Sequence, residues 1–305
     1  MTEHRTIRIG TRGSQLALAQ TEMVIQALQR SFPHMVAEKV VLCTIGDRVH
    51  NKPLAAFGGQ GIFVAEFEDA LRDGRIDLAV HSAKDMPMKL GDGMEIAGVL
   101  PRGDPHDLLA VRRSTDLGAW TNPVIGTGSP RRQFQAETLF PTASFADMRG
   151  NIPTRLQKLL DGAYDGIILA AAGVQRLHFE KDTRFCFHNF NTEQMLPAGG
   201  QGVIAVECCA DSEAAARMRV VSDRRTMDEL ETERRVLSLL NAGCHEAIGA
   251  FAQVQGSDIQ LTVKRALEGR VLFRQDSAPV GERLQLAEKL AEDIAAEGKI
   301  WESSI

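Results

Sequence analysis

The stretch Thr6-Ile7-Arg8-Ile9-Gly10-Thr11-Arg12-Gly13-Ser14 decides how the first part of the chain folds. Its residues up to Gly10 alternate in the manner of a short strand, and the turn that follows leads into helical spacing from Leu16 to Leu28, with Ser14 as the helix cap. Val36 to Thr44 has the composition of a second strand. The sequence therefore predicts a β-α-β opening with Arg12 at the mouth of the first turn, where ligands of open α/β sheets bind.

A related pattern recurs later in the chain. Ile125-Gly126-Thr127-Gly128-Ser129 resembles the opening stretch, with Ser129 as a helix cap and Pro130 as the first helical residue. Asp161-Gly162-x-x-Asp165 resembles Asp73-Gly74-x-x-Asp77, each leading into an apolar strand, which in the later case is expected over Tyr164 to Ala172. Weak internal repetition of this kind predicts two similarly built α/β domains. Two such domains facing each other would form a cleft between them.

Breaks in the pattern indicate where the chain passes between domains. Pro101 to Pro105 interrupts two strands, and a Gly-rich stretch at 195–202 precedes a strand from Val203 to Cys208. If that strand returns to the first sheet, the first domain is discontinuous and the two crossings form a hinge. Beyond residue 223 a helix and three strands joined by Gly-containing turns predict a small antiparallel sheet. The expected domains are 1–100 with 199–220, then 104–196, then 223–305.

Composition limits the possible functions of these 305 residues. The formal net charge of −5 argues against a basic nucleic-acid binder. The N-terminus lacks the apolar core of a signal peptide, and the apolar run Ile167 to Ala172 is far shorter than the ~20 residues of a membrane span. We therefore expect a cytoplasmic protein without nucleic-acid or membrane partners. It is expected to be a monomer, since nothing such as a heptad seam demands a partner.

The cysteines do not form a framework. There are five, an odd number, and no C-x-x-C pair occurs, which argues against structural disulfides and against a zinc site. Cys244 stands apart because glycines flank it in Asn241-Ala242-Gly243-Cys244-His245-Glu246-Ala247-Ile248-Gly249. Taken alone, it could be a packed small residue or a thiol on a turn that a bulky group can approach.

Arginine is strongly favoured over lysine, with 26 arginines and nine lysines. The bias has two explanations, genomic base composition or planar recognition of carboxylate and phosphate groups. Position favours the second, because five arginines of the second expected domain lie at strand ends or helix starts, where anions are stabilised. They are Arg131, Arg132, Arg149, Arg155 and Arg176. We expect a ligand with many negative charges.

A polar cluster follows the buried strand Ile76 to Val80. It consists of His81, Ser82, Lys84 and Asp85, and Pro87 closes it. A Ser-His-Asp triad does not follow from this order, because adjacent strand positions point in alternating directions. A phosphate-binding loop motif is also missing from the sequence. A single carboxylate facing a cationic cleft suits the stabilisation of a developing cation or the donation of a proton.

Five motifs, in order, resemble the porphobilinogen deaminase (hydroxymethylbilane synthase) family over about residues 5 to 250. They are Thr11-Arg12-Gly13-Ser14-x-Leu16-Ala17, Val80-His81-Ser82-Ala83-Lys84-Asp85-Met86-Pro87, Gly126-Thr127-Gly128-Ser129-Pro130-Arg131-Arg132-Gln133, Arg149-Gly150-Asn151-x-x-Thr154-Arg155-Leu156 and Gly200-Gln201-Gly202.

The resemblance implies an α/β fold with two domains like those of type II periplasmic binding proteins, a hinge, and a small α+β C-terminal domain. It implies a transferase of tetrapyrrole (porphyrin and haem) biosynthesis that joins four porphobilinogens head to tail, with release of ammonia, to give hydroxymethylbilane. A dipyrromethane cofactor, made from two substrate units, would be held by a thioether to Cys244. Asp85 would be the catalytic carboxylate that stabilises developing pyrrole cations.

The resemblance also distributes the remaining site residues. Cofactor binding would fall to Lys84, Ser129, Arg131, Arg132 and Gly150. Binding of the substrate acetate and propionate groups would fall to Arg12, Ser14, Arg149, Arg155, Arg176 and Gln201. No metal is expected.

The sequence departs from the family pattern at several places. Ala56, Gln60 and Ala65 stand where the family usually has lysines, His106 stands where an arginine is usual, and the cysteine loop lacks its usual proline. Two alternatives stay open. One is a solute-binding or sensory protein of the same architecture that binds an anion without chemistry. The other, which the missing lysines keep open, is a relative that binds tetrapyrrole precursors but turns over poorly.

Overall fold

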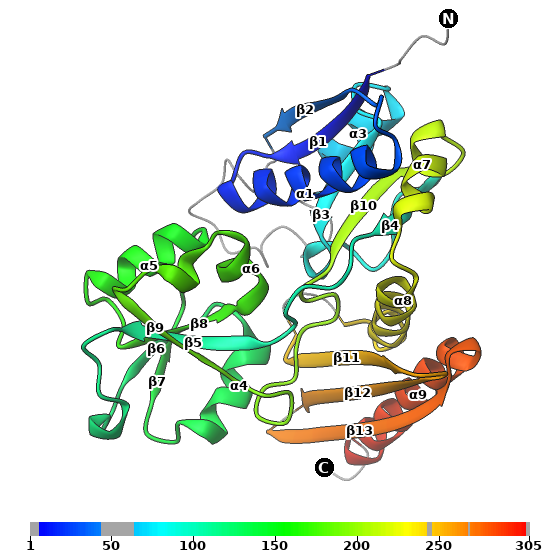
Figure 1. Cartoon of the computed structure of the whole chain (residues 1–305). Coiled ribbons are helices and arrows are strands. Elements are labelled where there is room, and N and C mark those ends of the chain that lie inside the picture. Colours follow the sequence, from blue (N-terminus) through cyan, green and yellow to red (C-terminus); the bar gives the residue numbers. More distant parts are fainter. Residues whose placement is uncertain (1–5, 44–63, 243–245, 268, 303–305) are drawn as a thin grey trace, which may run out of the picture.

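The computed structural model describes residues 6–43, 64–242, 246–267 and 269–302. Three sheets organise these residues (Figure 1). Two have five strands each, and the third has three strands and lies with the last helix at the C-terminal end of the chain. The third sheet is antiparallel throughout.

The first sheet has the strand order β2-β1-β3-β10-β4. Strands β1, β2 and β3 are parallel, and β10 is antiparallel to both of its neighbours. The strands are β1 (Ile7–Arg12), β2 (Ala37–Leu42), β3 (Leu78–Ser82), β4 (Met94–Val99) and β10 (Ile204–Cys209). Its helices are α1 (Gln15–Ser31), α3 (Ala65–Arg72) and α7 (Glu213–Val221), with the short 3-10 turn η2 (Ala83–Asp85) after β3.

The second sheet has the order β7-β6-β8-β5-β9. Strands β6, β7 and β8 are parallel, and β5 is antiparallel to β8 and β9. The strands are β5 (Asp107–Arg112), β6 (Val124–Gly126), β7 (Ser144–Ala146), β8 (Gly166–Ala170) and β9 (Phe185–Asn189). Its helical elements are η3 (Leu117–Ala119), α4 (Pro130–Leu139), α5 (Ile152–Leu160), α6 (Ala171–Arg176) and η4 (Phe179–Lys181).

The two sheets repeat one plan, as the internal repetition predicted. In each sheet, three parallel strands lie beside an antiparallel strand. The chain enters β5 directly after the first crossing, at residues 101–105, and β10 directly after the second crossing, at residues 195–202. Strand β10 lies in the first sheet between β3 and β4, and two segments link the sheets (Figure 1). The arrangement confirms the predicted α/β fold class. The domain limits stated above stay a prediction.

The third unit packs two helices on the small sheet. Its strands are β11 (Ile248–Gln255), β12 (Asp258–Leu267) and β13 (Arg270–Pro279), and its helical elements are α8 (Arg224–Leu239), η5 (Val280–Glu282) and α9 (Arg283–Glu302). Alternate strand residues such as Ala250, Leu261 and Val263 are fully buried against α8 and α9. In Figure 1 α8 lies between the first sheet and the third.

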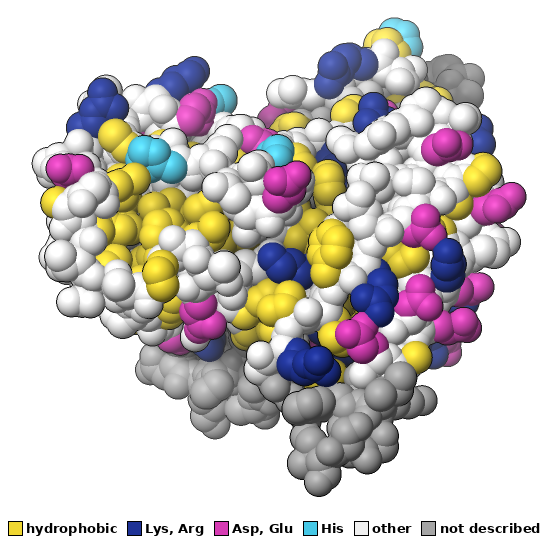
Figure 2. All heavy atoms as spheres, turned by 90° about the horizontal axis from the view of Figure 1, so that it is seen from below, with side chains coloured by type: hydrophobic (Ala, Val, Ile, Leu, Met, Phe, Trp, Pro, Cys, Tyr) yellow, Lys and Arg dark blue, Asp and Glu magenta, His cyan; other side chains and the backbone are white. Residues whose placement is uncertain are grey.

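The distribution of hydrophobic and charged side chains differs between the two parts of the molecule that are seen from below. Seen from below, hydrophobic side chains gather on the part that holds the second sheet, and charges of both signs are spread over the other part (Figure 2). The second sheet has a core cluster rich in aromatic residues, in which Trp120, Phe140 and Phe145 are half-buried around a fully buried Ile125.

Several elements differ from the sequence prediction. Residues 171 and 172 were expected to continue a strand, but they begin α6, because a short apolar run does not distinguish a buried strand from a buried helix. Strand β9 and helix α7 were not predicted at all. Within the described residues, no helix is long and apolar enough to cross a membrane.

Candidate functional site

A cavity of about 500 Å³ lies where the two five-stranded units and the second crossing meet. Strands β1 and β3 are parallel neighbours, so their carboxyl ends open at the same edge of the first sheet and bring Arg12 and the η2 turn to one wall. Nine of the predicted site residues line it: Arg12, Ser14, Lys84, Asp85, Arg132, Arg149, Gly150, Arg155 and Arg176.

The wall from the first sheet is built by local sequence signals. Ser14 has an extended backbone and its Oγ accepts a hydrogen bond from the amide of Ala17 at 3.2 Å, which confirms it as the cap of α1. Lys84 and Asp85 lie on η2, directly after β3. Asp85 is exposed at the cavity, and Lys84 is half-buried.

The wall from the second sheet centres on the start of α5. Asn151 caps this helix through the amide of Thr154 at 2.9 Å. Gly150 has a φ of 113°, a left-handed value that favours glycine, and its carbonyl accepts from Arg155 Nε at 2.6 Å. That bond fixes the Arg155 side chain beside the cavity. Arg149 Nε contacts Asp147 at 3.1 Å.

Arg176 ties the second wall to the crossing. It is the last residue of α6, and its Nη2 donates to the carbonyl oxygen of Gly202 at 2.6 Å. Gly202 itself lines the cavity. The cavity is therefore closed on this side by a contact between the second unit and the return crossing.

Positive charges crowd the cavity enough to change their pKa values. Burial lowers the pKa of Lys84 to about 8, with the carboxylate of Asp85 opposing the shift and Arg132 adding to it. Burial, assisted by the charge of Arg132, lowers the pKa of Arg155 to about 10. Burial also lowers the pKa of Arg176 to about 10. The cavity therefore favours an anion that restores these charges, and Asp85 is the carboxylate that acts on both Lys84 and Arg155.

Asp107 organises the residues behind the cavity. It is fully buried at the start of β5, with Arg131 and Arg132 nitrogens each 2.8 Å from its oxygens. Gln201 Nε2 donates to the same carboxylate at 3.0 Å. Burial alone would raise the pKa of Asp107, but the charges of the two arginines outweigh it and hold that pKa well below its usual range.

Three predicted site residues lie away from the cavity surface. Arg131 is buried and donates to the Leu196 carbonyl at 2.6 Å, and Gln201 donates to the Pro105 carbonyl at 2.7 Å. Ser129 caps α4 through the amide of Arg132 at 3.5 Å, with Pro130 as the first helical residue as predicted. Their contacts in the structure are with the protein, so direct ligand binding by these three stays a prediction.

Sequence reasoning missed other residues of the site. Asp107 pairs across the fold with arginines of α4, and nothing near it in the sequence indicated those partners. Gln20 is buried on α1, and its Nε2 donates to Ser82 Oγ at 3.0 Å on the same wall. No local signal separated Gln20 from an ordinary polar helix residue.

Comparison with known proteins places this arrangement. Residues 7–217 match the family model "Porphobilinogen deaminase, dipyromethane cofactor binding domain". The chain belongs to the porphobilinogen deaminase family. Three curated proteins named porphobilinogen deaminase are similar along nearly the whole chain. The protein of Syntrophus aciditrophicus is 40% identical and covers 94% of each chain. That of Roseiflexus sp. is 38% identical (96% of this chain, 97% of the relative), and that of Streptococcus sanguinis is 39% identical (97% of each).

Among solved structures, substrate binding domain 2 of GlnP from Lactococcus lactis is 10% identical, with a TM-score of 0.40, covering 72% of this chain and 89% of that chain.

Part of the family's site lies outside the described residues. Cys244, the predicted attachment point of the cofactor, is among them, and so are Ala56 and Gln60. The residues that flank the cysteine loop are placed: Ala242 and Ile248 are both buried in the core of the third unit, and the Ala250 amide donates to Pro197 in the second crossing at 3.1 Å. Ala65 begins α3 and is exposed.

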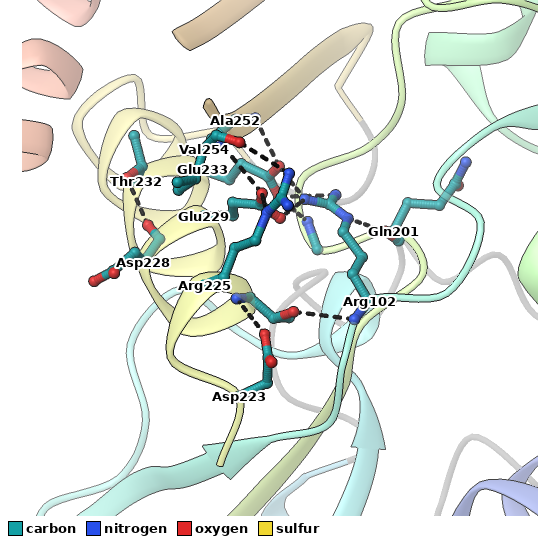
Figure 3. A network of polar contacts seen from close by, with 12 residues as sticks. Arg102, Gln201, Asp223, Arg225, Asp228, Glu229, Thr232, Glu233, Ala252 and Val254 are labelled. Carbon is teal, nitrogen blue, oxygen red and sulfur yellow. Dashed lines mark hydrogen bonds and ion pairs between the residues drawn. The ribbon is translucent and has the colours of Figure 1, made fainter. Parts of the chain in front are cut away.

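A buried ion pair holds this third unit to both crossings (Figure 3). Glu233 on α8 is fully buried, and its carboxylate contacts Arg102 at 2.7 Å, the amide of Gly200 at 2.6 Å and the amide of Ala252 at 2.8 Å. Arg102 belongs to the first crossing and also donates to the Gln201 carbonyl at 3.0 Å. One carboxylate therefore joins the first crossing, the second crossing and strand β11.

The cavity suits the family's cofactor in charge. A dipyrromethane made from two porphobilinogen units carries acetate and propionate carboxylates, and the lining offers Lys84 and five arginines against the single carboxylate of Asp85 among the predicted site residues. Arg12, Lys84, Arg132, Arg149, Arg155 and Arg176 are the residues that would hold these groups.

Proposed function

We propose that this chain is a transferase that condenses four porphobilinogen molecules head to tail, with release of ammonia, to give hydroxymethylbilane for tetrapyrrole biosynthesis. The observation that supports it best is the cavity, where Asp85 is surrounded by cationic side chains in a chain of this family. We propose that it acts as a cytoplasmic monomer with domains at 1–100 with 199–220, 104–196 and 223–305.

The arginines bind and orient the substrate. Each porphobilinogen brings an acetate and a propionate group, and each well-made contact between a guanidinium and a carboxylate contributes roughly 1.5–3 kcal/mol. Arg155 is held in place by the Gly150 carbonyl, and Arg176 by the Gly202 carbonyl. Pre-positioned side chains lose less conformational entropy when the ligand binds, so this geometry favours tight and oriented binding.

Asp85 supplies the negative charge where the reaction develops a positive one. Protonation of the substrate amino group lets it leave as ammonia, and the electron-poor carbon that results must be stabilised until the new carbon–carbon bond forms and the attacking pyrrole carbon gives up its proton. Asp85 is exposed to the cavity on a short turn and can hold or transfer that proton while its charge stabilises the cation. Lys84 and Arg155 orient the substrate carboxylates around it.

The dipyrromethane group, when bound, supplies the terminus onto which substrate units are added, and we propose Cys244 as its attachment point. The residues that line the cavity serve to keep the growing pyrrole chain bound. The carboxylates of that chain would lie on the arginines of α5 and α6, while the third unit is held to the crossings through Glu233.

Turnover of porphobilinogen by the purified full chain tests this function. Consumption of porphobilinogen and release of ammonia are measured for the wild type, for Asp85→Asn, and for Asp92→Asn, which alters an exposed carboxylate in the turn before β4. Asp85→Asn should lower kcat by about 10²–10³-fold, the usual effect of losing one well-placed electrostatic group. Asp92→Asn should match the wild type. A wild-type protein that binds porphobilinogen without consuming it would establish the non-catalytic alternative.

A further inference from the structure

A buried histidine–carboxylate pair lies behind the Asp85 turn. Glu207 on β10 is fully buried, His81 on β3 is 8% exposed, and the distance from His81 Nε2 to Glu207 Oε2 is 2.9 Å. In the antiparallel register Glu207 is opposite Ala79 and His81 is opposite Ala205, so the two side chains are diagonal neighbours on one face of the sheet. This pair was not assigned any function from the sequence.

The pair adjoins the catalytic cavity. His81 lines a small cavity of about 90 Å³ together with Arg12 and Asp85. Six of its lining residues, Arg12, Ser14, Leu16, Gln20, Ser82 and Asp85, also line the large cavity. On its other side the His81 ring meets the ring of Phe67 from α3 edge-on, with 5.1 Å between centroids. His81 therefore lies between a buried carboxylate and the space that Asp85 faces.

Glu207 depends on His81 for its charge balance. Among the described residues, its ion pair is with His81 and with no lysine or arginine. An unpaired carboxylate in the interior is strongly disfavoured, so the 2.9 Å contact with His81 is the one that compensates Glu207. Without His81, a bare negative charge would remain behind Asp85.

We propose that His81, held by Glu207, is a positioning residue for Asp85. The pair fixes the end of β3 that leads into η2, and it keeps a second negative charge away from the cavity in which Asp85 stabilises a cation. A bare like charge behind the turn would repel the Asp85 carboxylate and disturb the position from which it faces the cavity. This inference rests on the proposed function.

A double-mutant cycle with neutral, similarly shaped replacements tests it. His81→Gln keeps a donor for Glu207 but leaves the carboxylate without a compensating charge. Glu207→Gln removes the negative charge, and the double variant restores a neutral pair. The steady-state kcat and KM for porphobilinogen, the dipyrromethane adduct by intact mass, and the thermal midpoint are measured for each purified full-length protein.

His81→Gln should lose kcat by about tenfold or more, with KM within about twofold of the wild type and the adduct retained, because the loss concerns Asp85 and not the arginines. The double variant should recover most of that kcat. A purely structural role would change the thermal midpoints without this rescue. Full activity in His81→Gln, or a folded double variant as inactive as His81→Gln, would overturn the proposal.

Two further outcomes are covered by the same set of proteins. If His81→Gln does not fold, the double variant decides alone: it should fold and turn over within about threefold of Glu207→Gln, and a folded but inactive double variant overturns the proposal. If the wild type itself neither carries the adduct nor consumes porphobilinogen, the proposed function fails instead. The failure of each idea is thereby recognised separately.

Discussion

Replacement of Asp107 by asparagine should reveal how strongly one carboxylate holds the hinge together. Asp107 is fully buried, and it contacts Arg131 and Arg132 at 2.8 Å and Gln201 at 3.0 Å. The asparagine side chain is uncharged, so two buried guanidiniums would lose their counter-charge. Breaking a buried ion pair from one side costs about 3–5 kcal/mol, which corresponds to roughly a thousandfold change in the ratio of folded to unfolded protein.

The pH dependence should distinguish this effect from a simple packing defect. The pKa of Asp107 in the folded protein lies well below its usual range, whereas in the unfolded chain it is about 3.9. Its contribution is therefore fully present above the unfolded-state pKa and is lost as the pH falls toward the folded-state pKa. The stability gap between wild type and Asp107→Asn should be large at pH 7 and should narrow as the pH drops below about 4.

Urea unfolding followed by circular dichroism, at pH 7 and at several acidic values, measures this gap. Asp69→Asn is the matched control, because Asp69 has a contact of 3.0 Å with Arg72 on the surface of α3 and its side chain is 67% exposed. The control should change stability by less than about 0.5 kcal/mol. If Asp107→Asn unfolds at the same urea concentration as Asp69→Asn, Asp107 does not neutralise the two arginines in the way described.

Three further substitutions test neighbouring parts of the site. Because burial lowers the pKa of Lys84 to about 8, its positive charge is lost as the pH rises past that value. The KM of the wild type for porphobilinogen should therefore rise between pH 7 and 9, whereas the KM of Lys84→Arg should stay nearly constant. Equal pH dependence of KM in both proteins would contradict a role for Lys84 in anion binding. Glu233→Gln should lower the free energy of unfolding by about 2–4 kcal/mol in urea, since Arg102 is then buried without its main counter-charge. An unchanged urea midpoint would show that the third unit is held by other contacts. Gly200→Ala should lower kcat more than it raises KM. Gly200 has a φ of 76°, and a methyl group there would lie 2.9 Å from the Lys84 amide, next to Asp85. Unchanged steady-state kinetics would show that this close approach does not position the η2 turn.

Local signals predicted much of the fold. Ser14 and Ser129 were expected as helix caps from their place before apolar helical spacing, and both accept the expected amide hydrogen bonds. The two-domain repeat was visible because Ile125 to Ser129, at β6 and the start of α4, repeats the strand-turn-helix pattern of the opening stretch. These features depend on residues close together in the chain, which is why the sequence alone was sufficient.

The errors concern segments whose pattern is short or ambiguous. Ala171 and Ala172 follow an apolar strand without a break, so their helical state is decided by packing and not by periodicity. Helix α7 was missed, although Ser212 followed by an Ala-rich run could have indicated it, because Ser212 caps its first turn through the Ala215 amide at 3.1 Å.

The sequence predicted the charged residues of the site better than the buried ion pairs that hold them in place. Arginines expected at strand ends and helix starts indicated an anion-binding cavity, and Arg149, Arg155 and Arg176 do line one, although Arg176 ends helix α6 and does not follow a strand. The internal carboxylates were not predicted, because Asp107 and Glu233 find their partners through long-range contacts between crossings and helices. Pairs of that kind leave no local pattern, and only the folded structure brings them together.

The intact mass of the denatured protein tests the central claim most directly. Wild-type protein made in a host that produces porphobilinogen should exceed its sequence mass by one dipyrromethane unit, and peptide mapping should place that group on the peptide that contains Cys244. Cys244→Ser should have the mass of its sequence alone. Unmodified wild-type protein, or an adduct that persists in Cys244→Ser, would contradict the account.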